Sequence, residues 1–182
     1  MNDFIKQNIM EKIIIIYSNI INGVNIKMLK LYIPKLEDLW FREQLMSDKE
    51  TMSYNEAWGG TIPFPKQKWE SWYNYYIINN ENKRFYSYLL DGNINEYVGE
   101  VSYHYDDNLK VFICGIIILS KYRSKGYGTE GLNLLCDVAL KNGIATLYDN
   151  IGKNNNSINL FIKNGFIIEY ETNEFIMVKK NL

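Results

Sequence analysis

Glycines and cations between an apolar segment and a helical pattern give this sequence its first indication of chemistry. Arg123, Gly126 and Gly128 lie within residues 122–132, directly after the apolar run 111–119. Glycine lets a backbone turn tightly and approach a ligand closely. The N–H groups and the macrodipole at the start of the following helix attract anions. The segment therefore predicts a phosphate-binding loop.

The same glycines also allow a dinucleotide site. Gly126, Gly128 and Gly131 fit the G-x-G-x-x-G fingerprint, and Asp149 stands near the position of a ribose-binding acid. In a dinucleotide fold, however, the glycines follow the strand at once, whereas residues 120–125 intervene here. Too few residues remain after Gly131 to complete a doubly wound sheet. A dinucleotide-binding enzyme is therefore the third alternative, and a glycine loop without any ligand is another.

Two segments of the chain resemble a known family. Residues 123–128, Arg-Ser-Lys-Gly-Tyr-Gly, resemble the R/Q-x-x-G-x-G/A loop of the GCN5-related N-acetyltransferase (GNAT) superfamily. Residues 126–132 are closest in wording to its ribosomal-protein and polyamine N-acetyltransferase branch. Residues 154–166 resemble the family's N-x-x-S/A-x-x-L-Y/F-x-x-x-G-F segment. The two segments occur in the family's order, separated by a predicted helix and a predicted strand.

The resemblance implies an acyltransferase that moves an acetyl group from acetyl-CoA to a primary amine by direct attack. The expected coenzyme-binding residues comprise the loop for the pyrophosphate and two further segments for the pantetheine arm: Ile116, Ile118, Arg123, Ser124, Lys125, Gly126, Tyr127, Gly128, Thr129 and Asn154. No metal is expected. The alternative is a catalytically silent CoA-binding sensor or partner-binding module of the same fold.

Glu100 is the predicted general base. An alkylamine with a pKa near 10.4 is almost fully protonated at neutral pH, so a group must accept its proton. Strand alternation over residues 96–105 places Glu100, Ser102 and His104 on one face. This face lines a cleft or, in the alternative interpretation, faces solvent. His104 is more simply a surface or structural residue than a catalytic one.

The general acid is left open by the sequence. The family often uses a tyrosine in the second segment to protonate the leaving thiolate, and Phe161 occupies that position here. Tyr148 or Tyr122 could replace it, water could do so, or the thiolate could leave unprotonated.

The acceptor site is expected among the aromatic residues that precede the sheet. Tyr54 and Trp58 are the predicted substrate-binding residues, and Trp58 lies in a Gly-rich loop. Most of the neighbouring aromatic residues are expected in the core, because Trp and Tyr at helical spacing are usually buried: Phe64, Trp69, Trp72 and Tyr73. Such faces suit a compact apolar, aromatic or cationic amine, and not a polyanion. A small molecule and a protein N-terminus both remain open as acceptors.

Composition narrows the class of protein. The chain has 182 residues, a net charge of −1 and scattered Lys and Arg, which disfavours nucleic acid as a partner. The apolar segment 13–21 is shorter than the roughly 20 residues of a membrane span. Cys114 and Cys136 fit buried thiols of a reducing compartment, so a cytoplasmic protein is expected. A homodimer is a further expectation.

The predicted elements alternate between strands and helices. Residues 1–26 are expected to be an N-terminal extension, and residues 27–182 an N-acetyltransferase domain. Strands are predicted over residues 27–33, 84–90, 96–105, 111–119, 145–151, 166–170 and 175–179. Helices are predicted over 36–45, 67–78 and 155–164, and a further helix follows the glycine loop, with helical spacing from Leu132 to Leu140 and a stop at Asn142 and Gly143. Composition alone indicates only α with β, but this order is the one that the resemblance to the acetyltransferase family implies, and it predicts one α/β (α+β) domain. A mixed central sheet of six to seven strands would be flanked by about four helices.

Overall fold

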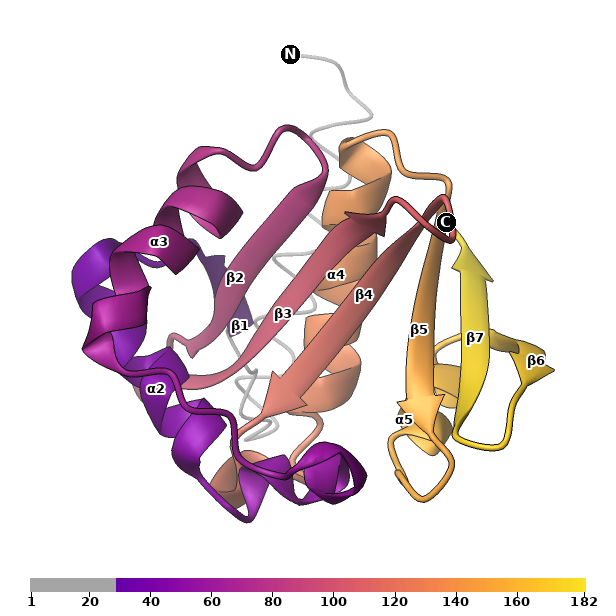
Figure 1. Ribbon diagram of the computed structural model, residues 1–182, viewed down its shortest axis with the longest axis horizontal. Coiled ribbons are helices and arrows are strands. Elements are labelled where there is room, and N and C mark those ends of the chain that lie inside the picture. The colour runs from indigo at the N-terminus through magenta and orange to yellow at the C-terminus, as the bar shows by residue number, and fades with distance from the viewer. Residues whose placement is uncertain (1–28) are drawn as a thin grey trace, which may run out of the picture.

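The computed structural model describes residues 29–182, apart from the side chains of residues 57 and 58 (Figure 1). Its strands are β1 (Leu29–Tyr32), β2 (Arg84–Asp91), β3 (Glu96–Asp106), β4 (Val111–Ile118), β5 (Thr146–Gly152), β6 (Ile167–Glu171) and β7 (Phe175–Asn181). Its helices are α2 (Trp40–Ser47), α3 (Trp69–Tyr73), α4 (Tyr127–Lys141) and α5 (Ile158–Lys163). Shorter helical segments are η1 (Leu36–Leu39), η2 (Thr51–Trp58), η3 (Lys66–Lys68), η4 (Asn74–Ile78) and η5 (Ser120–Tyr122). The predicted N-terminal extension lies outside the described residues.

The described strands form one seven-stranded mixed sheet in the order β1-β2-β3-β4-β5-β7-β6. Neighbouring strands are antiparallel except β4 and β5, which are parallel because α4 connects them as a crossover helix. This sheet confirms the predicted α+β class and the predicted order of elements. It differs from the parallel sheet that a doubly wound dinucleotide fold requires.

Helices cover both faces of the sheet. Tyr103 of β3 accepts a hydrogen bond from the side chain of Asn142, at the end of α4, with a distance of 2.6 Å. Glu100 of the same strand binds Arg42 of α2. Because odd and even residues of a strand point to opposite faces, α4 and α2 lie on opposite sides of β3 (Figure 1).

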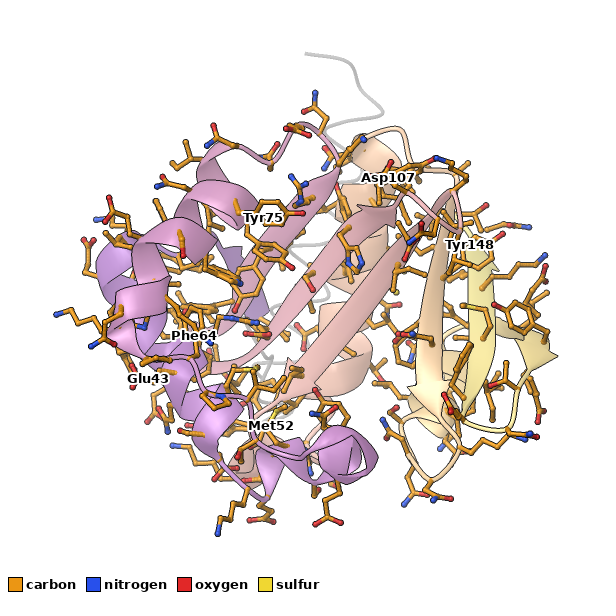
Figure 2. All side chains as sticks on the ribbon, in the orientation of Figure 1. Glu43, Met52, Phe64, Tyr75, Asp107 and Tyr148 are labelled. Carbon is orange, nitrogen blue, oxygen red and sulfur yellow. The ribbon has the colours of Figure 1, made fainter. Side chains whose placement is uncertain are left out.

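The core lies between the sheet and these helices. Fully buried apolar residues come from both layers: Leu39, Leu45, Tyr88, Leu89, Val101, Leu132, Leu135, Leu147, Phe161, Phe166 and Val178. Leu132, Leu135 and Ala139 form the buried stripe of α4 that their spacing predicts. Leu140, which the same pattern would include, is 54% exposed. Figure 2 shows Phe64, from the loop before η3, and Tyr75 of η4 beside β2.

The parallel pair β4 and β5 separates soon after it forms. The strands pair only at Phe112 with Leu147 and at Ile113 with Tyr148. Beyond these positions β5 pairs with β7 alone, while β4 continues beside β3. The separation opens a gap inside the sheet, which positions the candidate site.

The helices between β1 and β2 are less regular than their sequence pattern predicts. The segment predicted as one helix over residues 67–78 divides into a 3₁₀ turn, the α-helix α3 and the π-helical turn η4. The segment between the predicted helices 36–45 and 67–78, for which no element was predicted, contains the 3₁₀ helix η2. In the part of the chain that the structure describes, no helix combines the length and the apolar character that a membrane span needs.

Candidate active site

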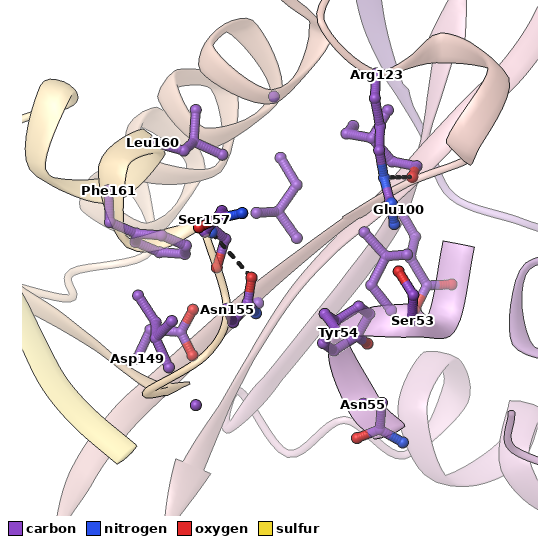
Figure 3. A pocket seen from close by; sticks show the side chains of 18 of the residues that line it. Ser53, Tyr54, Asn55, Glu100, Arg123, Asp149, Asn155, Ser157, Leu160 and Phe161 are labelled. Atoms are coloured by element: carbon purple, nitrogen blue, oxygen red, sulfur yellow. Dashed lines mark hydrogen bonds between the residues drawn. The ribbon is translucent and has the colours of Figure 1, made fainter. Parts of the chain in front are cut away.

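One cavity of about 960 Å³ occupies the gap between β4 and β5 and continues over the start of α4. Its lining combines residues from η2, β3, β4, the glycine loop, β5 and α5: Ser53, Tyr54, Asn55, Glu100, Ser102, Gly115, Ile116, Ile117, Ile118, Arg123, Ser124, Gly126, Gly128, Thr129, Asp149, Asn150, Ile151, Gly152, Asn154, Asn155, Asn156, Ser157, Leu160 and Phe161. In Figure 3, Asp149, Ser157 and Phe161 lie on one side of the cavity, and Tyr54, Glu100 and Arg123 on the other. The volume suits an extended ligand of substantial size.

The glycine loop forms one end of the cavity. Gly126 precedes α4 with φ of 84°, a left-handed conformation that glycine adopts without strain. Gly128 lines the cavity in the first turn of α4, where backbone N–H groups lack acceptors within the helix. This end of the cavity therefore has the backbone donors and the positive helix end that favour an anion.

Arg123 ties the glycine loop to the segment before η2. Its guanidinium donates to the backbone carbonyl oxygens of Glu50, at 3.1 Å, and of Thr51, and its Nε donates to that of Ile118 at 3.3 Å. The side-chain oxygen of Thr51 accepts from the backbone N–H of Ser120 at 2.9 Å. These bonds fix the segment that carries Tyr54 against the end of β4.

Glu100 lies at the centre of a buried polar cluster. Its Oε1 accepts from Arg42 at 2.5 Å, and its Oε2 accepts from the hydroxyl of Tyr86. Glu100 is only 5% exposed, so the alternative of a solvated carboxylate on an exposed strand face is wrong. Burial is the largest single influence on Arg42 and would lower its pKa, but the charges and hydrogen bonds of Glu100 and Tyr86 together raise that pKa overall.

Aromatic rings enclose the guanidinium of Arg42. Its Cζ lies 4.6 Å from the ring centroid of Trp72, 5.2 Å from that of Tyr86 and 5.3 Å from that of Phe64. Such stacking stabilises a cation. Trp72 and Phe64 thus contribute to the buried polar cluster and do not line the cavity among the described residues.

Tyr54 is the aromatic residue of η2 that lines the cavity. Burial, followed by the charge of Glu100, raises the pKa of Tyr54 to about 12. Its hydroxyl therefore stays protonated near neutral pH and can act as a hydrogen-bond donor. The side chain of Trp58, the second predicted acceptor residue, lies outside the described part of the chain.

Asp149 is the second carboxylic acid of the cavity. Burial raises its pKa to about 7, although the backbone N–H of Asn150 opposes this effect. The ion pairs within residues 29–182 do not include it. The sequence suggested Asp149 only as a ribose-binding acid, because its burial depends on the separation of β4 and β5.

Eight of the ten predicted coenzyme-binding residues line this cavity, and the other two, Lys125 and Tyr127, are not among its lining residues. Tyr127 is buried, and its hydroxyl donates to Asp91 at 2.5 Å. Lys125 is exposed, and its Nζ lies 5.4 Å above the ring of Tyr122. Coenzyme binding by these two residues stays a prediction.

The structure also separates the two candidate acids from the cavity. Tyr122 is buried beside the loop and donates its hydroxyl proton to Glu96. Tyr148 precedes Asp149 on β5 and so points to the opposite face of the strand. Neither residue belongs to the lining, whereas Phe161 does.

Arg42 is a site residue that sequence analysis missed. It stands on α2 among residues with helical spacing, and nothing in its neighbourhood along the chain indicates a partner 58 positions away. Its Nε is buried and lacks a hydrogen-bond partner within residues 29–182. The sequence offered one signal for Arg42: it is a single cation on the core-facing side of a helix. A buried cation is rarely found without an acidic partner.

Comparisons with known proteins agree with this geometry. The acetyltransferase (GNAT) family matches residues 43–166, which include both motif segments. No curated protein sequence matches the chain.

Solved structures with the same fold include a spermidine N-acetyltransferase from Vibrio cholerae in complex with CoA and spermine. It is 19% identical, with a TM-score of 0.69 over 84% of this chain and 95% of that chain. A domain from Methanocaldococcus jannaschii is 21% identical, with a TM-score of 0.70 over 86% and 100%. A GNAT-family acetyltransferase from Bacillus anthracis is 16% identical, with a TM-score of 0.64 over 84% and 93%.

These structures support the fold. The family match spans more than half of the sequence and includes the glycine loop at one end of the cavity. The chain therefore belongs to the acetyltransferase (GNAT) family.

Proposed function

We propose that this protein transfers the acetyl group of acetyl-CoA to a primary amine by direct attack. The observation that carries the proposal is the continuity of the cavity, which joins the glycine loop and the start of α4 to the carboxylic acids Glu100 and Asp149. One end suits phosphates. The other end suits proton transfer.

The donor would extend from the glycine loop into the sheet. Gly126, Gly128 and Thr129 would receive the pyrophosphate, and the charge of Arg123 would add attraction there. The pantetheine arm would follow β4 along Ile116 and Ile118, where the backbone has lost β5 as a neighbour. Asn154 lies along the same cavity and would donate a hydrogen bond to the arm.

Glu100 would accept the proton that the amine loses. It lines the cavity, and its two oxygens each accept one hydrogen bond from the protein. A carboxylate has about four lone-pair sites, so capacity for a further donor remains. Arg42 and Tyr86 would then fix the orientation of the base, as general-base catalysis requires.

The acceptor would be a compact amine with an apolar or cationic body. Among the described lining residues Arg123 is the single cation, and its guanidinium already donates to backbone carbonyls. A polyanion would find little compensation there. The Vibrio cholerae relative is a spermidine N-acetyltransferase, so polyamines belong in the first group of amines to test, together with amino acids and N-terminal peptides.

A panel of amines with detection of the free thiol of CoA tests the proposal. Turnover with a compact amine, together with a higher melting temperature in acetyl-CoA than in NAD, is expected. Binding of acetyl-CoA without turnover across the panel would indicate a CoA-binding sensor instead. Stabilisation by NAD and not by acetyl-CoA would indicate a dinucleotide protein.

A further inference from the structure

The position of Asp149 along the sheet carries an inference about the reaction. Tyr148 is the last residue of β5 that pairs with β4, so Asp149 is the first residue of β5 inside the gap. By continuation of that register, Asp149 lies level with Cys114, and Gly115 is the first β4 residue of the lining. Asp149 therefore stands at the closed end of the gap, opposite the glycine loop.

The position of Asp149 determines which part of a bound donor it meets. Acetyl-CoA is a long molecule with its phosphates near one end and its thioester at the other. If its phosphates occupy Gly126 and Gly128, an arm that extends along β4 places the sulfur near the closed end. In Figure 3 the carboxyl group of Asp149 points into the cavity, on the same side as Phe161.

We propose that Asp149 is a catalytic residue that donates its proton to the sulfur of the departing CoA. The inference rests on the proposed acetyl transfer. As the amine nitrogen forms its bond to the carbonyl carbon, the carbon–sulfur bond breaks and its electron pair stays on sulfur. The proton of Asp149 then passes to that sulfur, and Glu100 holds the proton that the amine has lost. Transfer of that proton to solvent and reprotonation of Asp149 restore the enzyme.

The surroundings of Asp149 favour a neutral, proton-donating carboxyl group. Burial raises its pKa to about 7, so a large fraction carries a proton at neutral pH. Phe161, which lines the same cavity, has no proton to donate. Asp149 is half-buried, and an acid whose pKa lies near the working pH is suited to proton transfer.

Other charged and titratable groups around the cavity do not replace it near neutral pH. Burial and the charge of Asp149 raise the pKa of Cys114, and the pKa of Tyr54 is about 12, so both are weaker acids than Asp149. Cys114 is not among the described lining residues, and Tyr54 lies on the other side of the cavity. Glu100 is paired with Arg42. Arg123 is a cation at every pH of the assay and binds backbone carbonyls.

The test compares the wild type with Asp149→Asn in single-turnover acetyl transfer, with enzyme in excess over acetyl-CoA and with saturating amine. Single turnover isolates the chemical step from product release. The amine titrates in the same way in both proteins, so the ratio of the two rates reports on Asp149. We expect the wild type to be faster on the order of 10²-fold at pH 6, within the usual range for acid catalysis. Above about pH 7 the ratio should fall about tenfold per pH unit, because the wild type loses its proton.

Three controls keep the result specific. Acetyl-CoA should still raise the melting temperature of Asp149→Asn, which shows a folded protein with an intact donor site. Asp137→Asn, an exposed carboxyl of α4 outside the cavity, should react at the wild-type rate. The double variant Asp149→Asn, Phe161→Tyr places a phenol in the same cavity and should regain at least about tenfold.

Two results would overturn the inference while acetyl transfer itself stands. One is a wild-type to Asp149→Asn ratio within threefold at every pH, and the other is a ratio that is constant or rises with pH. If the wild type binds acetyl-CoA and transfers acetyl to no amine, the proposed function fails and the inference fails with it.

Discussion

Under the proposed function, stability and activity depend on the same pair of side chains, Glu100 and Arg42. Breaking a buried ion pair by removing one partner typically costs about 3–5 kcal/mol, because the remaining charge is buried without compensation. Arg42 and Glu100 are 17% and 7% exposed as side chains. We expect Glu100→Gln to lower the free energy of unfolding by about that amount, measured by urea denaturation. Turnover should fall on the order of 10²–10⁴-fold if Glu100 is the direct base.

A matched surface pair provides the control for Glu100. Lys83 and Asp107 are 44% and 68% exposed as side chains and lie 3.4 Å apart, so Asp107→Asn should cost no more than about 1 kcal/mol. Replacing Arg42 by Met in the Glu100→Gln background should recover stability without activity. Equal losses of unfolding free energy in Glu100→Gln and Asp107→Asn would show that the buried ion pair stabilises the protein no more than the exposed pair does.

Asp149 should give the molecule an unusual dependence of stability on pH. Its pKa is about 7 when folded and near the ordinary value of 3.8 when unfolded, so the native state binds more protons between these values. Stability is therefore greatest below about pH 4 for this group and decreases as pH rises to about 7. We expect Asp149→Asn to melt at a higher temperature than the wild type at pH 8, and at nearly the same temperature at pH 4.5.

The same melting experiments on Asp137→Asn provide the comparison for Asp149. Its difference from the wild type should not change between the two pH values, because Asp137 is exposed on α4. An Asp149→Asn variant that is equally stabilised or destabilised at both pH values would contradict the assigned pKa.

At the scale of elements, the first turn of α4 should control donor binding. A Cβ at Gly128 would lie 3.1 Å from Cδ2 of Leu160, a flexible side chain that can shift, so the fold should tolerate substitution. Gly128→Glu adds volume and negative charge where the pyrophosphate is expected, and it should abolish the increase in melting temperature that acetyl-CoA causes.

Two further variants show whether this effect is local. Gly128→Ala should keep part of the increase in melting temperature that acetyl-CoA causes. Asn133→Glu adds the same charge on the exposed side of α4 and should keep all of that increase. An undiminished increase in Gly128→Glu would place the donor elsewhere.

The 3₁₀ helix η2 should control acceptor binding. Tyr54 lines the cavity from this helix, on the side opposite Phe161 (Figure 3). Tyr54→Ala should raise the KM for the amine and leave the acetyl-CoA melting shift unchanged, because it removes a wall of the acceptor side only. Unchanged amine kinetics would assign Tyr54 to packing, and a loss of the acetyl-CoA shift would assign it to the donor site.

Elements with a strong pattern could be predicted from sequence, and elements without one could not. The apolar run of β4 and the stripe of α4 specify their own structure, and the motif segments place the glycine loop between them. η2 has no such pattern, and the π-helical turn η4 follows α3 without a break in composition. The separation of β4 from β5 depends on pairing between distant segments, so the burial of Asp149 had no local signal.

At the scale of the whole molecule, the two carboxylic acids of the cavity come from opposite sides of the gap in the sheet. β3 and β4 carry Glu100 and the predicted path of the pantetheine arm, and β5 carries Asp149 across the gap. The resemblance of two short segments was sufficient to predict this sheet and the position of its loop. It could not predict the pairing of Arg42 with Glu100, because α2 and β3 meet only through the tertiary fold.

The central claim is that acetyl leaves CoA and appears on an amine in the same cavity. The most direct measurement quantifies free CoA thiol and N-acetylated amine together, by thiol titration and mass spectrometry, for the wild type and Gly128→Glu. The account predicts equal amounts of the two products from the wild type with a compact amine, and neither from Gly128→Glu. Thiol release without an acetylated amine, or an undiminished yield from Gly128→Glu, would contradict it.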